Sequence, residues 1–325
     1  LVRPREATVP HLTRLIEGED VATVLRAAHL LSRFDRVAKS AVPALVKATA
    51  RLGEQDAQAV LPKALGVIGE SAVEDIIAGL AASQYPETTL RRYVDALILI
   101  GPDAISSLAN ALFHTSPQVR SGAVLTLGTS GKSAGHLVPK IITLLDDDDA
   151  FVRASAAEAL GKLGPAARAA APILAGKLND TVSRVRAAAV IGLGKTAGDD
   201  VTYAALFASA LNADEASVRI AATRVLSKLP AIATAAAENL VAALVDEDEH
   251  VRAGAARALG VAGKDIASSV PALVQQLRDP VDEVRVEIVR ALGAIGETTP
   301  GVIAELGATI ADPSPKVRRQ GVLTL

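Results

Sequence analysis

Acidic side chains form dense clusters of potential metal ligands in two runs of the sequence, 146–149 (DDDD) and 246–249 (DEDE). Such carboxylates bind calcium when they alternate along a loop around a central glycine. Neither run has this spacing or the glycine. We therefore interpret both runs as solvated turns before a helix, whose dipole favours negative charge, with a weak surface cation site as the alternative.

Two other segments resemble part of a phosphate-binding loop. Residues 131–133 (GKS) and 194–196 (GKT) match the end of G-x-x-x-x-G-K-[ST], but Thr126 and Ala189 occupy the place of its first glycine. The motif also has to follow a strand, and neither segment does. The sequence therefore predicts no nucleotide site.

The remaining candidates for catalysis are isolated residues. The five histidines lie in separate segments, none of them within H-E-x-x-H, and Ser130 lies in GTSGK, which lacks the second glycine of a nucleophile elbow. Cysteine is absent, which excludes thiolate metal sites, cysteine nucleophiles and disulfides but leaves the compartment open. We predict no catalytic residue, no metal ligand and no cofactor.

The elements that carry these residues repeat along the chain. The dipeptide Val-Arg recurs every 33 residues, beginning at Val119, Val152, Val185, Val218, Val251, Val284 and Val317. Apolar residues three or four apart follow each Arg and predict an amphipathic helix. A glycine eight residues after the Arg, often with a second glycine three residues later, predicts the end of that helix.

A second helical pattern precedes each Val-Arg. Leu or Ile stands seven residues before every one of these valines, and Pro139, Pro172 and Pro271 share one register near the start of the pattern, where proline is best tolerated in a helix. Each repeat is thus predicted to be a pair of helices joined by a short acidic turn.

An aspartate stands five residues before the Val in five repeats: Asp147, Asp180, Asp246, Asp279 and Asp312. His114 and Ala213 replace it in the other two, and Asp214 is adjacent to Ala213. If the chain were an enzyme, these aspartates would be candidate catalytic carboxylates. Because they recur once per repeat, we favour a structural role, in which each caps the second helix and pairs with an arginine of its own or the next repeat.

The pattern P-x-L-x-x-L-x-D followed by V-R-x-x-A-x-x-x-L-G resembles the HEAT repeat, in the short form shared with phycobilisome lyases. The resemblance implies an all-α fold, an α-solenoid that forms a right-handed superhelix of about ten helix-pair repeats. Stacking is also expected because one amphipathic pair cannot bury its own apolar stripe. We predict a single domain over 1–325, with irregular repeats over 1–118 and regular repeats over 119–325. The His–Glu metal ligands of deoxyhypusine hydroxylase, a HEAT enzyme, are absent, since no histidine is followed by Glu.

The composition agrees with tightly packed helices. Half of the 325 residues are apolar but only 2% are aromatic, so the core must consist mainly of Ala, Val, Leu and Ile. This apolar content excludes a disordered chain, and the net charge of −2 argues against a globally basic nucleic-acid binder. No apolar run is long enough for a membrane span. Because methionine is absent and the sequence stops within a helical pattern, we expect a piece of a longer protein.

Positions five and nine after the repeated Arg should point outward from the second helix, which lines the concave face of a HEAT solenoid. In the later repeats these positions carry a basic stripe: Lys162, Lys195, Arg224, Lys228, Arg257 and Arg290. Such a stripe fits an acidic peptide, the acidic face of a protein or nucleic-acid phosphates. A purely solubilising role is the alternative. We expect Arg224, Arg257 and Arg290 to contribute most to binding.

These observations predict a non-enzymatic scaffold or adaptor that binds a protein partner, or another region of its parent chain, along its extended surface. An assembly factor or lyase-like accessory subunit that handles a client protein is the alternative. A nucleic-acid adaptor comes third, because the chain is slightly acidic and lacks stacking aromatics. A designed repeat protein stays open, although the irregular first repeats argue against it.

Overall fold

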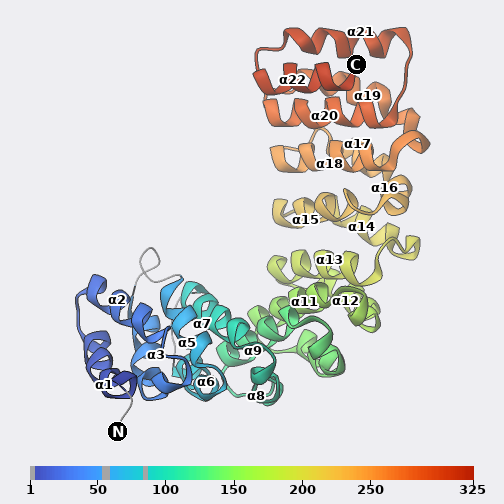
Figure 1. Cartoon of the computed structure of the whole chain (residues 1–325). Helices are drawn as coiled ribbons and strands as arrows, with labels where there is room; N and C mark the ends of the chain where they lie inside the picture. Colours follow the sequence, from blue (N-terminus) through green and yellow to red (C-terminus); the bar gives the residue numbers. More distant parts are fainter. Residues whose placement is uncertain (1–3, 53–58, 83–86) are drawn as a thin grey trace. The chain divides into compact units, whose positions relative to one another are not determined.

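The computed structural model describes residues 4–52, 59–82 and 87–325, and throughout these ranges its regular elements are α-helices and short 3-10 helices, with no strand. Contacts along the chain divide it into two compact units, Leu1–Ala166 and Ala167–Leu325 (Figure 1). Each unit is a succession of helix pairs. The all-α solenoid architecture predicted from the sequence is confirmed, whereas the single domain over 1–325 stays a prediction.

Unit 1 contains five helix pairs within its described residues. Its α-helices are α1 (Pro4–Glu17), α2 (Val21–Leu31), α3 (Val42–Arg51), α5 (Val60–Ile68), α6 (Val73–Ala82), α7 (Glu87–Ile100), α8 (Ile105–Ala111), α9 (Pro117–Thr129), α10 (Val138–Thr143) and α11 (Ala150–Leu163). The 3-10 helices η1 (Asp35–Ala41), η2 (Glu70–Ala72), η3 (Gly101–Ala104), η4 (Gly131–Leu137) and η5 (Leu144–Asp146) connect them, and η6 (Gly164–Ala170) follows α11. Helix α7 packs against both α5 and α9, and α9 packs against α11.

Unit 2 contains five further pairs. Its α-helices are α12 (Ala171–Gly176), α13 (Ser183–Ala197), α14 (Ala204–Ala210), α15 (Ala216–Leu226), α16 (Pro230–Ala235), α17 (Ala237–Ala243), α18 (Glu249–Ala262), α19 (Val270–Gln275), α20 (Asp282–Ile295), α21 (Pro300–Ala308) and α22 (Pro315–Thr324). Its 3-10 helices are η7 (Lys177–Asn179), η8 (Val201–Tyr203), η9 (Gly263–Ser269), η10 (Gln276–Arg278) and η11 (Thr309–Ala311). Helices α14 and α15 therefore form one pair. In the pair that follows, α16 and α17 together take the place of the first helix.

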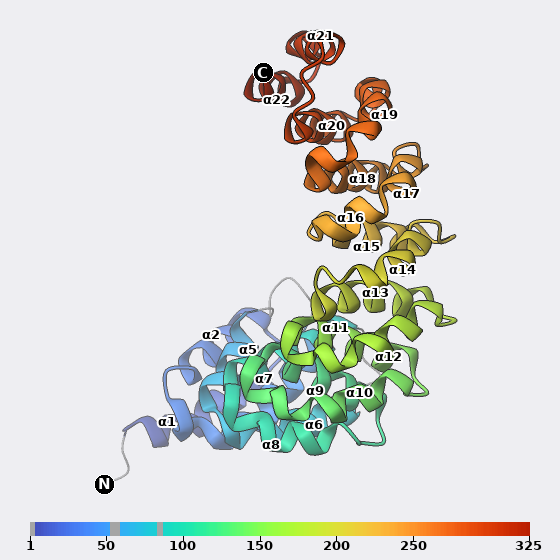
Figure 2. The ribbon, with the colours of Figure 1, turned by 90° about the vertical axis from the view of Figure 1, so that its right-hand side faces the viewer.

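The second helices of the pairs in unit 2 stack directly on one another. Helix α13 contacts α15, α15 contacts α18, α18 contacts α20, and α20 contacts α22. In Figure 2 these second helices lie on one side of the unit, and α14, α17 and α19 lie on the other. We refer to the outward surface of α13, α15, α18 and α20 as the second-helix face.

Three positions of the second helix contribute side chains to the core in the regular repeats of α13 and α18. In α13 these are Val185, Ala189 and Leu193, which are one turn apart and fully buried. The equivalent residues of α18 are Val251, Ala255 and Leu259, also fully buried. The sequence prediction of an inward stripe is therefore confirmed, and the small central residue keeps neighbouring helices close.

The two repeated glycines have different roles, and only the second follows the helix. Gly128 and Gly260 lie in the last turns of α9 and α18, one and two residues before the helices end. A Cβ on Gly128 would lie 2.6 Å from the Cα of Ala159 in α11, so this glycine permits close helix packing. The second glycine ends the helix: Gly263 follows α18 with a φ of 69°, a value that favours glycine.

One helical stretch of the described residues, 87–111, is long and apolar enough for a membrane span by composition, with a mean hydropathy of 1.2. It is α7, η3 and α8 taken together, and Gly101 interrupts it with a φ of 76°. Leu90, Tyr93 and Leu97 of α7 are buried within unit 1. The apolar residues of this stretch thus belong largely to the core, which makes it weak evidence for a span.

Candidate interaction surface

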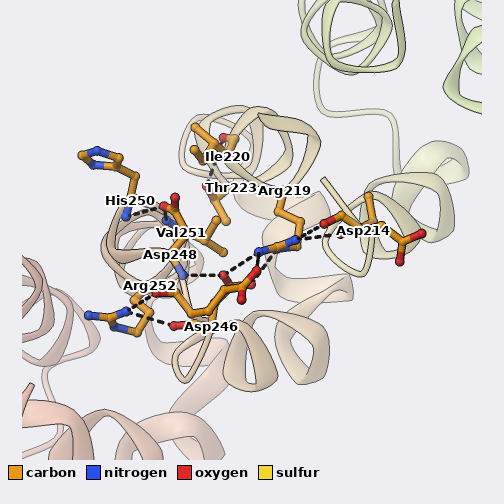
Figure 3. Close-up of polar contacts among 11 residues, drawn as sticks. Asp214, Arg219, Ile220, Thr223, Asp246, Asp248, His250, Val251 and Arg252 are labelled. Atoms are coloured by element: carbon orange, nitrogen blue, oxygen red, sulfur yellow. Dashed lines mark hydrogen bonds and ion pairs between the residues drawn. The ribbon is translucent and has the colours of Figure 1, made fainter. Parts of the chain in front are cut away.

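The turns between paired helices are joined by arginine–aspartate pairs. Arg219, in α15, donates from Nε and Nη2 to the two carboxylate oxygens of Asp246 at 2.7 and 2.9 Å (Figure 3). Its Nη1 donates to the main-chain oxygens of Ala213 and Asp214 at 2.9 and 2.8 Å. One guanidinium therefore binds the main chain of its own turn and forms a bidentate ion pair with the aspartate of the next turn. The planar guanidinium of arginine is well suited to this geometry.

The same arrangement recurs over a separation of 27 residues, as in Arg120 with Asp147, Arg252 with Asp279, and Arg285 with Asp312. In every case Nη1 also donates to carbonyl oxygens of the arginine's own turn. We call this series the turn ladder. Its members are partly or fully shielded from water; the Asp279 side chain, for example, is only 2% exposed.

The ladder corrects two expectations for the repeated aspartates. Asp246 pairs with Arg219 of the preceding repeat, and the arginine of its own repeat, Arg252, donates to its main-chain oxygen at 2.9 Å. The cap of α18 is Asp248, whose Oδ1 accepts from the main-chain N–H groups of His250 and Val251. Asp246 instead accepts from the N–H of Asp248 at 2.9 Å and shapes the turn before the cap.

In the repeat that contains α15, a glutamate takes the place of the missing ladder aspartate. Ala213 occupies the aspartate position before α15, and Arg186 of the preceding repeat pairs with Glu215 instead. Asp214, the adjacent acid that the sequence suggested, offers its main-chain oxygen to Arg219. Hydrogen bonding from Arg186 holds the pKa of Glu215 below its usual value.

The ladder carboxylates are electrostatically stabilised. Burial by itself would raise the pKa of Asp246, but hydrogen bonds from Arg219 and from the Asp248 N–H outweigh burial and hold this pKa below its usual value. The pKa of Asp147 is lowered by the same balance, with Arg120 as its partner. The hydrogen bond from Arg285 lowers the pKa of Asp312. These acids are therefore ionised and paired at neutral pH, which leaves them occupied as structural residues.

Five residues of the basic stripe lie on second helices, and Lys228 lies two residues beyond the end of α15. All six of its residues are exposed. Lys162 belongs to α11 of unit 1, and the other five belong to unit 2. Three of the six form ion pairs, and the other three form none among the described residues. The sequence does not reveal this difference.

Three cations of the stripe have acidic neighbours. Lys162 pairs with Glu158 one turn away, at 2.8 Å. Arg257 of α18 and Arg290 of α20 both pair with Glu287, at 3.1 and 2.9 Å, and the Glu287 side chain is only 6% exposed. Glu287 was not identified from the sequence, because it stands 30 residues from Arg257 rather than at a repeat-equivalent position.

The other three cations, Lys195, Arg224 and Lys228, have no carboxylate within ion-pair distance in the described part of the chain. They lie on adjacent helices. Gly194 of α13 is so close to Val225 of α15 that an added Cβ would meet the valine Cγ1 at 2.3 Å. Lys195 and Arg224 flank this contact, and Lys228 follows α15 by two residues. We call these three residues the basic cluster.

The segments that resemble chemical motifs are accounted for structurally. Thr196 of the GKT segment is buried, and its hydroxyl donates to the Gly192 carbonyl at 2.9 Å. His114, at the aspartate position of its repeat, accepts through Nδ1 from the Ser116 N–H at 3.0 Å, as Asp246 does in its own turn. Across the described ranges, no group of three or more His, Asp or Glu side chains is placed to hold a metal ion.

Comparison with known proteins agrees with this architecture. A family model described as HEAT repeats matches residues 105–194, 138–227 and 237–325. The comparison with curated proteins found no match. Among solved structures, Escherichia coli YibA is 19% identical over 78% of this chain and 91% of its own, with a TM-score of 0.57.

A second solved structure, importin beta, is 14% identical over 97% of this chain and 50% of its own, with a TM-score of 0.66. Human deoxyhypusine hydroxylase in complex with glycerol is 23% identical over 78% of this chain and 95% of its own, but its TM-score of 0.32 is too low for any inference. At these identities the structural likenesses establish the fold alone. Because the family model covers more than half of the residues, the chain belongs to the HEAT repeat family.

Proposed function

We propose that this chain is a protein-interaction scaffold that binds an acidic segment of a partner protein on the second-helix face of unit 2. The basic cluster of Lys195, Arg224 and Lys228 carries the proposal. These cations are exposed, lie on or just after two helices in direct contact, and have no acidic partners among the described residues, whereas the turn ladder already uses its own charges. Unpaired surface cations attract and orient an anionic ligand at little desolvation cost.

The ion pairs elsewhere on this face support the choice of these three residues. Arg257 and Arg290 share Glu287, so an incoming carboxylate would have to compete with a buried acid that is already in place. Lys162 is similarly balanced by Glu158. We therefore assign these three cations a secondary role, although from the sequence alone Arg257 and Arg290 were expected to contribute as much as Arg224.

An acidic peptide is favoured over nucleic acid by the composition of the surface. The whole chain contains three Tyr, four Phe and no Trp, which leaves few side chains on which bases could stack. The alternative of a lyase-like accessory subunit depends on the family resemblance alone. A nucleic-acid adaptor remains the third candidate.

Titration of a fluorescently labelled oligoglutamate peptide with the full chain tests the proposal. We expect Lys195→Glu/Arg224→Glu/Lys228→Glu to weaken binding by about tenfold or more, because three attractive contacts become repulsive. The matched control is Arg168→Glu/Lys264→Glu/Arg278→Glu, which changes the net charge equally and also replaces exposed cations of unit 2.

The two variants separate a localised site from general charge. Equal weakening by both would show that only net charge matters and would overturn the proposed site. Single-stranded DNA of the same length serves as a competitor. If the DNA binds more tightly than the peptide and the cluster variant abolishes that binding, the nucleic-acid adaptor replaces the scaffold as the better function.

A further inference from the structure

Two arginines of the second-helix face bind a side chain of the next second helix, 30 residues further along the chain. Arg257 of α18 donates from Nε to Oε2 of Glu287 in α20 at 3.3 Å, and its Nη2 lies 3.1 Å from Oε1 of the same carboxylate. Arg290 of α20 donates from Nε to Oε1 of Gln320 in α22 at 3.0 Å. Each arginine is thus matched by an acceptor in the following repeat.

The equivalent arginine of α15, Arg224, has no such acceptor. The residue 30 positions later is Gly254 of α18, which has no side chain. A Cβ at this place would lie 2.3 Å from Oγ1 of Thr223, whose hydroxyl donates to a main-chain oxygen within α15 (Figure 3). The chain therefore cannot supply an acceptor for Arg224 while this threonine is present.

The sequence of the earlier regular repeats shows that the acceptor accompanies the arginine. Three of these repeats have no arginine at the position of Arg224, and the residues 30 positions later are neither Glu nor Gln. The pairs are Leu125 with Ser155, Glu158 with Ala188, and Ile191 with Ala221. An arginine at this position that lacks a Glu or Gln partner thus occurs in the α15 repeat alone among the repeats from 119 onward.

Glu287 shows how a carboxylate is held at this place. Its Oε1 lies 3.1 Å from Nη2 of Arg257 and accepts from Nη1 of Arg290 at 2.9 Å, so one carboxylate bridges arginines of two adjacent helices. Its side chain is only 6% exposed, whereas the two arginines are about half exposed. By repeat equivalence, Arg224 and Arg257 flank Gly254 in the same way, on helices that are also in contact.

We propose that one aspartate or glutamate of the partner places its carboxylate over Gly254, where it forms a bidentate pair with Arg224 and lies beside Arg257. This inference rests on the proposed function and identifies its most specific contact. A guanidinium selects the orientation of a carboxylate through its planar fork, whereas Lys195 and Lys228 attract the acidic segment as point charges. The acidic segment is therefore positioned on the surface by the α15–α18 contact.

The double variant Thr223→Ala/Gly254→Glu tests this inference, because it copies the Ala256–Glu287 arrangement of the next repeat and supplies an internal carboxylate. We expect its affinity for the labelled oligoglutamate peptide to fall about fivefold, since Arg224 is then occupied. Adding Arg224→Ala to this chain should weaken binding by less than about twofold. The neutral variant Thr223→Ala/Gly254→Gln should lower the affinity by about threefold, because its amide oxygen also accepts from the arginine.

Two controls separate occupation of Arg224 from other effects. Thr223→Ala alone should keep the affinity of the unaltered chain, and so should Gln275→Glu, which adds the same negative charge at an exposed position of the first helix α19. Arg224→Lys leaves the core untouched and retains the charge but not the fork, so we expect binding about threefold weaker. Circular dichroism establishes that each chain is folded.

Unchanged affinity in both Gly254 variants, unchanged affinity in Arg224→Lys, or equal weakening by Gln275→Glu and Thr223→Ala/Gly254→Glu would overturn the inference. The proposed function would survive these results as long as Lys195→Glu/Arg224→Glu/Lys228→Glu still weakens binding. If the unaltered chain does not bind the peptide, the proposed function fails and this inference fails with it.

Discussion

The first three helix pairs of unit 1 and the pairs of unit 2 both use arginine to connect successive turns, but with different acceptors. In unit 1, Arg51 donates to the main-chain oxygens of Ile16 and Gly18 at 3.1 and 2.7 Å, and Arg92 donates to that of Leu52 at 2.7 Å. In unit 2, Arg219 and its equivalents combine such carbonyl contacts with a carboxylate.

This difference explains why one region has a visible repeat and the other does not. A main-chain carbonyl is available at every residue and requires no particular side chain. The spacing between arginine and acceptor is therefore free to vary in the first three pairs, and it is 33 residues for Arg51 and 40 residues for Arg92. A carboxylate acceptor requires an acid at one place in each repeat. The turn ladder therefore produces a regularly repeated acidic residue in the sequence, whereas arginine–carbonyl contacts produce almost no recurring side chain.

The largest expected effect comes from breaking a ladder pair. Arg252→Ala leaves the nearly inaccessible carboxylate of Asp279 without its cation, and we expect a loss of about 3 kcal/mol of unfolding free energy. Arg51→Ala removes only hydrogen bonds to carbonyls at an exposed site, and we expect a loss of about 1 kcal/mol. Urea unfolding followed by circular dichroism measures both. Equal losses would remove the distinction between the two regions.

Close packing of the regular repeats provides the next test. Gly128→Ala would place a Cβ 2.6 Å from the Ala159 backbone, and we expect overpacking to cost about 2 kcal/mol. Gly176→Ala, in α12, meets no atom within 4 Å and should instead stabilise the chain by about 0.5–1 kcal/mol through helix propensity. The same unfolding measurement applies. A neutral Gly128→Ala variant would mean that the helices separate easily.

Removal of the Glu287 charge sharpens the contrast between paired and unpaired cations. Glu287→Gln frees Arg257 and Arg290, so we expect a loss of about 1 kcal/mol in stability. Affinity for the oligoglutamate peptide should rise by about threefold, because two further cations become available. Unchanged affinity in the peptide titration would show that these arginines lie outside the binding surface.

The smallest expected effect is a change in acid sensitivity. The pKa of Asp246 is lower in the folded chain than its usual value, so the stabilisation that it contributes is present above about pH 4, the ordinary pKa of an unfolded aspartate, and is lost as the pH falls through the folded pKa. Asp246→Asn should therefore be less stable at pH 7 and show a shallower decline below pH 4. Melting temperatures of both chains across this range test the sign. A steeper decline in the variant would contradict it.

Much of the fold could be predicted because its determinants recur at one interval. The spacing of Val-Arg and of the buried Ala and Leu residues located the helices, and the repeated acids indicated the ladder. What the sequence could not show was which repeat supplies each partner. Asp246 was expected to cap a helix and bind an arginine of its own or the next repeat, whereas it binds Arg219 of the preceding one.

The candidate site was less predictable for a related reason. Comparison of repeat-equivalent residues identifies columns of like side chains, but an ion pair depends on the offset between neighbouring helices. Glu287 lies 30 residues after Arg257, and Glu215 lies 29 residues after Arg186, so neither acid is found by inspection at intervals of 33. These acids determine which cations are already neutralised, and the basic cluster could be identified only after they were placed.

Two arginines five residues apart on α15 provide the most direct test of the central claim that turn charges are structural and the basic cluster is available for binding. Urea unfolding and peptide titration should be carried out on Arg219→Ala and Arg224→Ala. We predict that Arg219→Ala loses about 3 kcal/mol of stability but retains peptide affinity, whereas Arg224→Ala changes stability by less than about 0.5 kcal/mol and loses several-fold in affinity. The opposite assignment, or equal effects in both variants, would contradict the account.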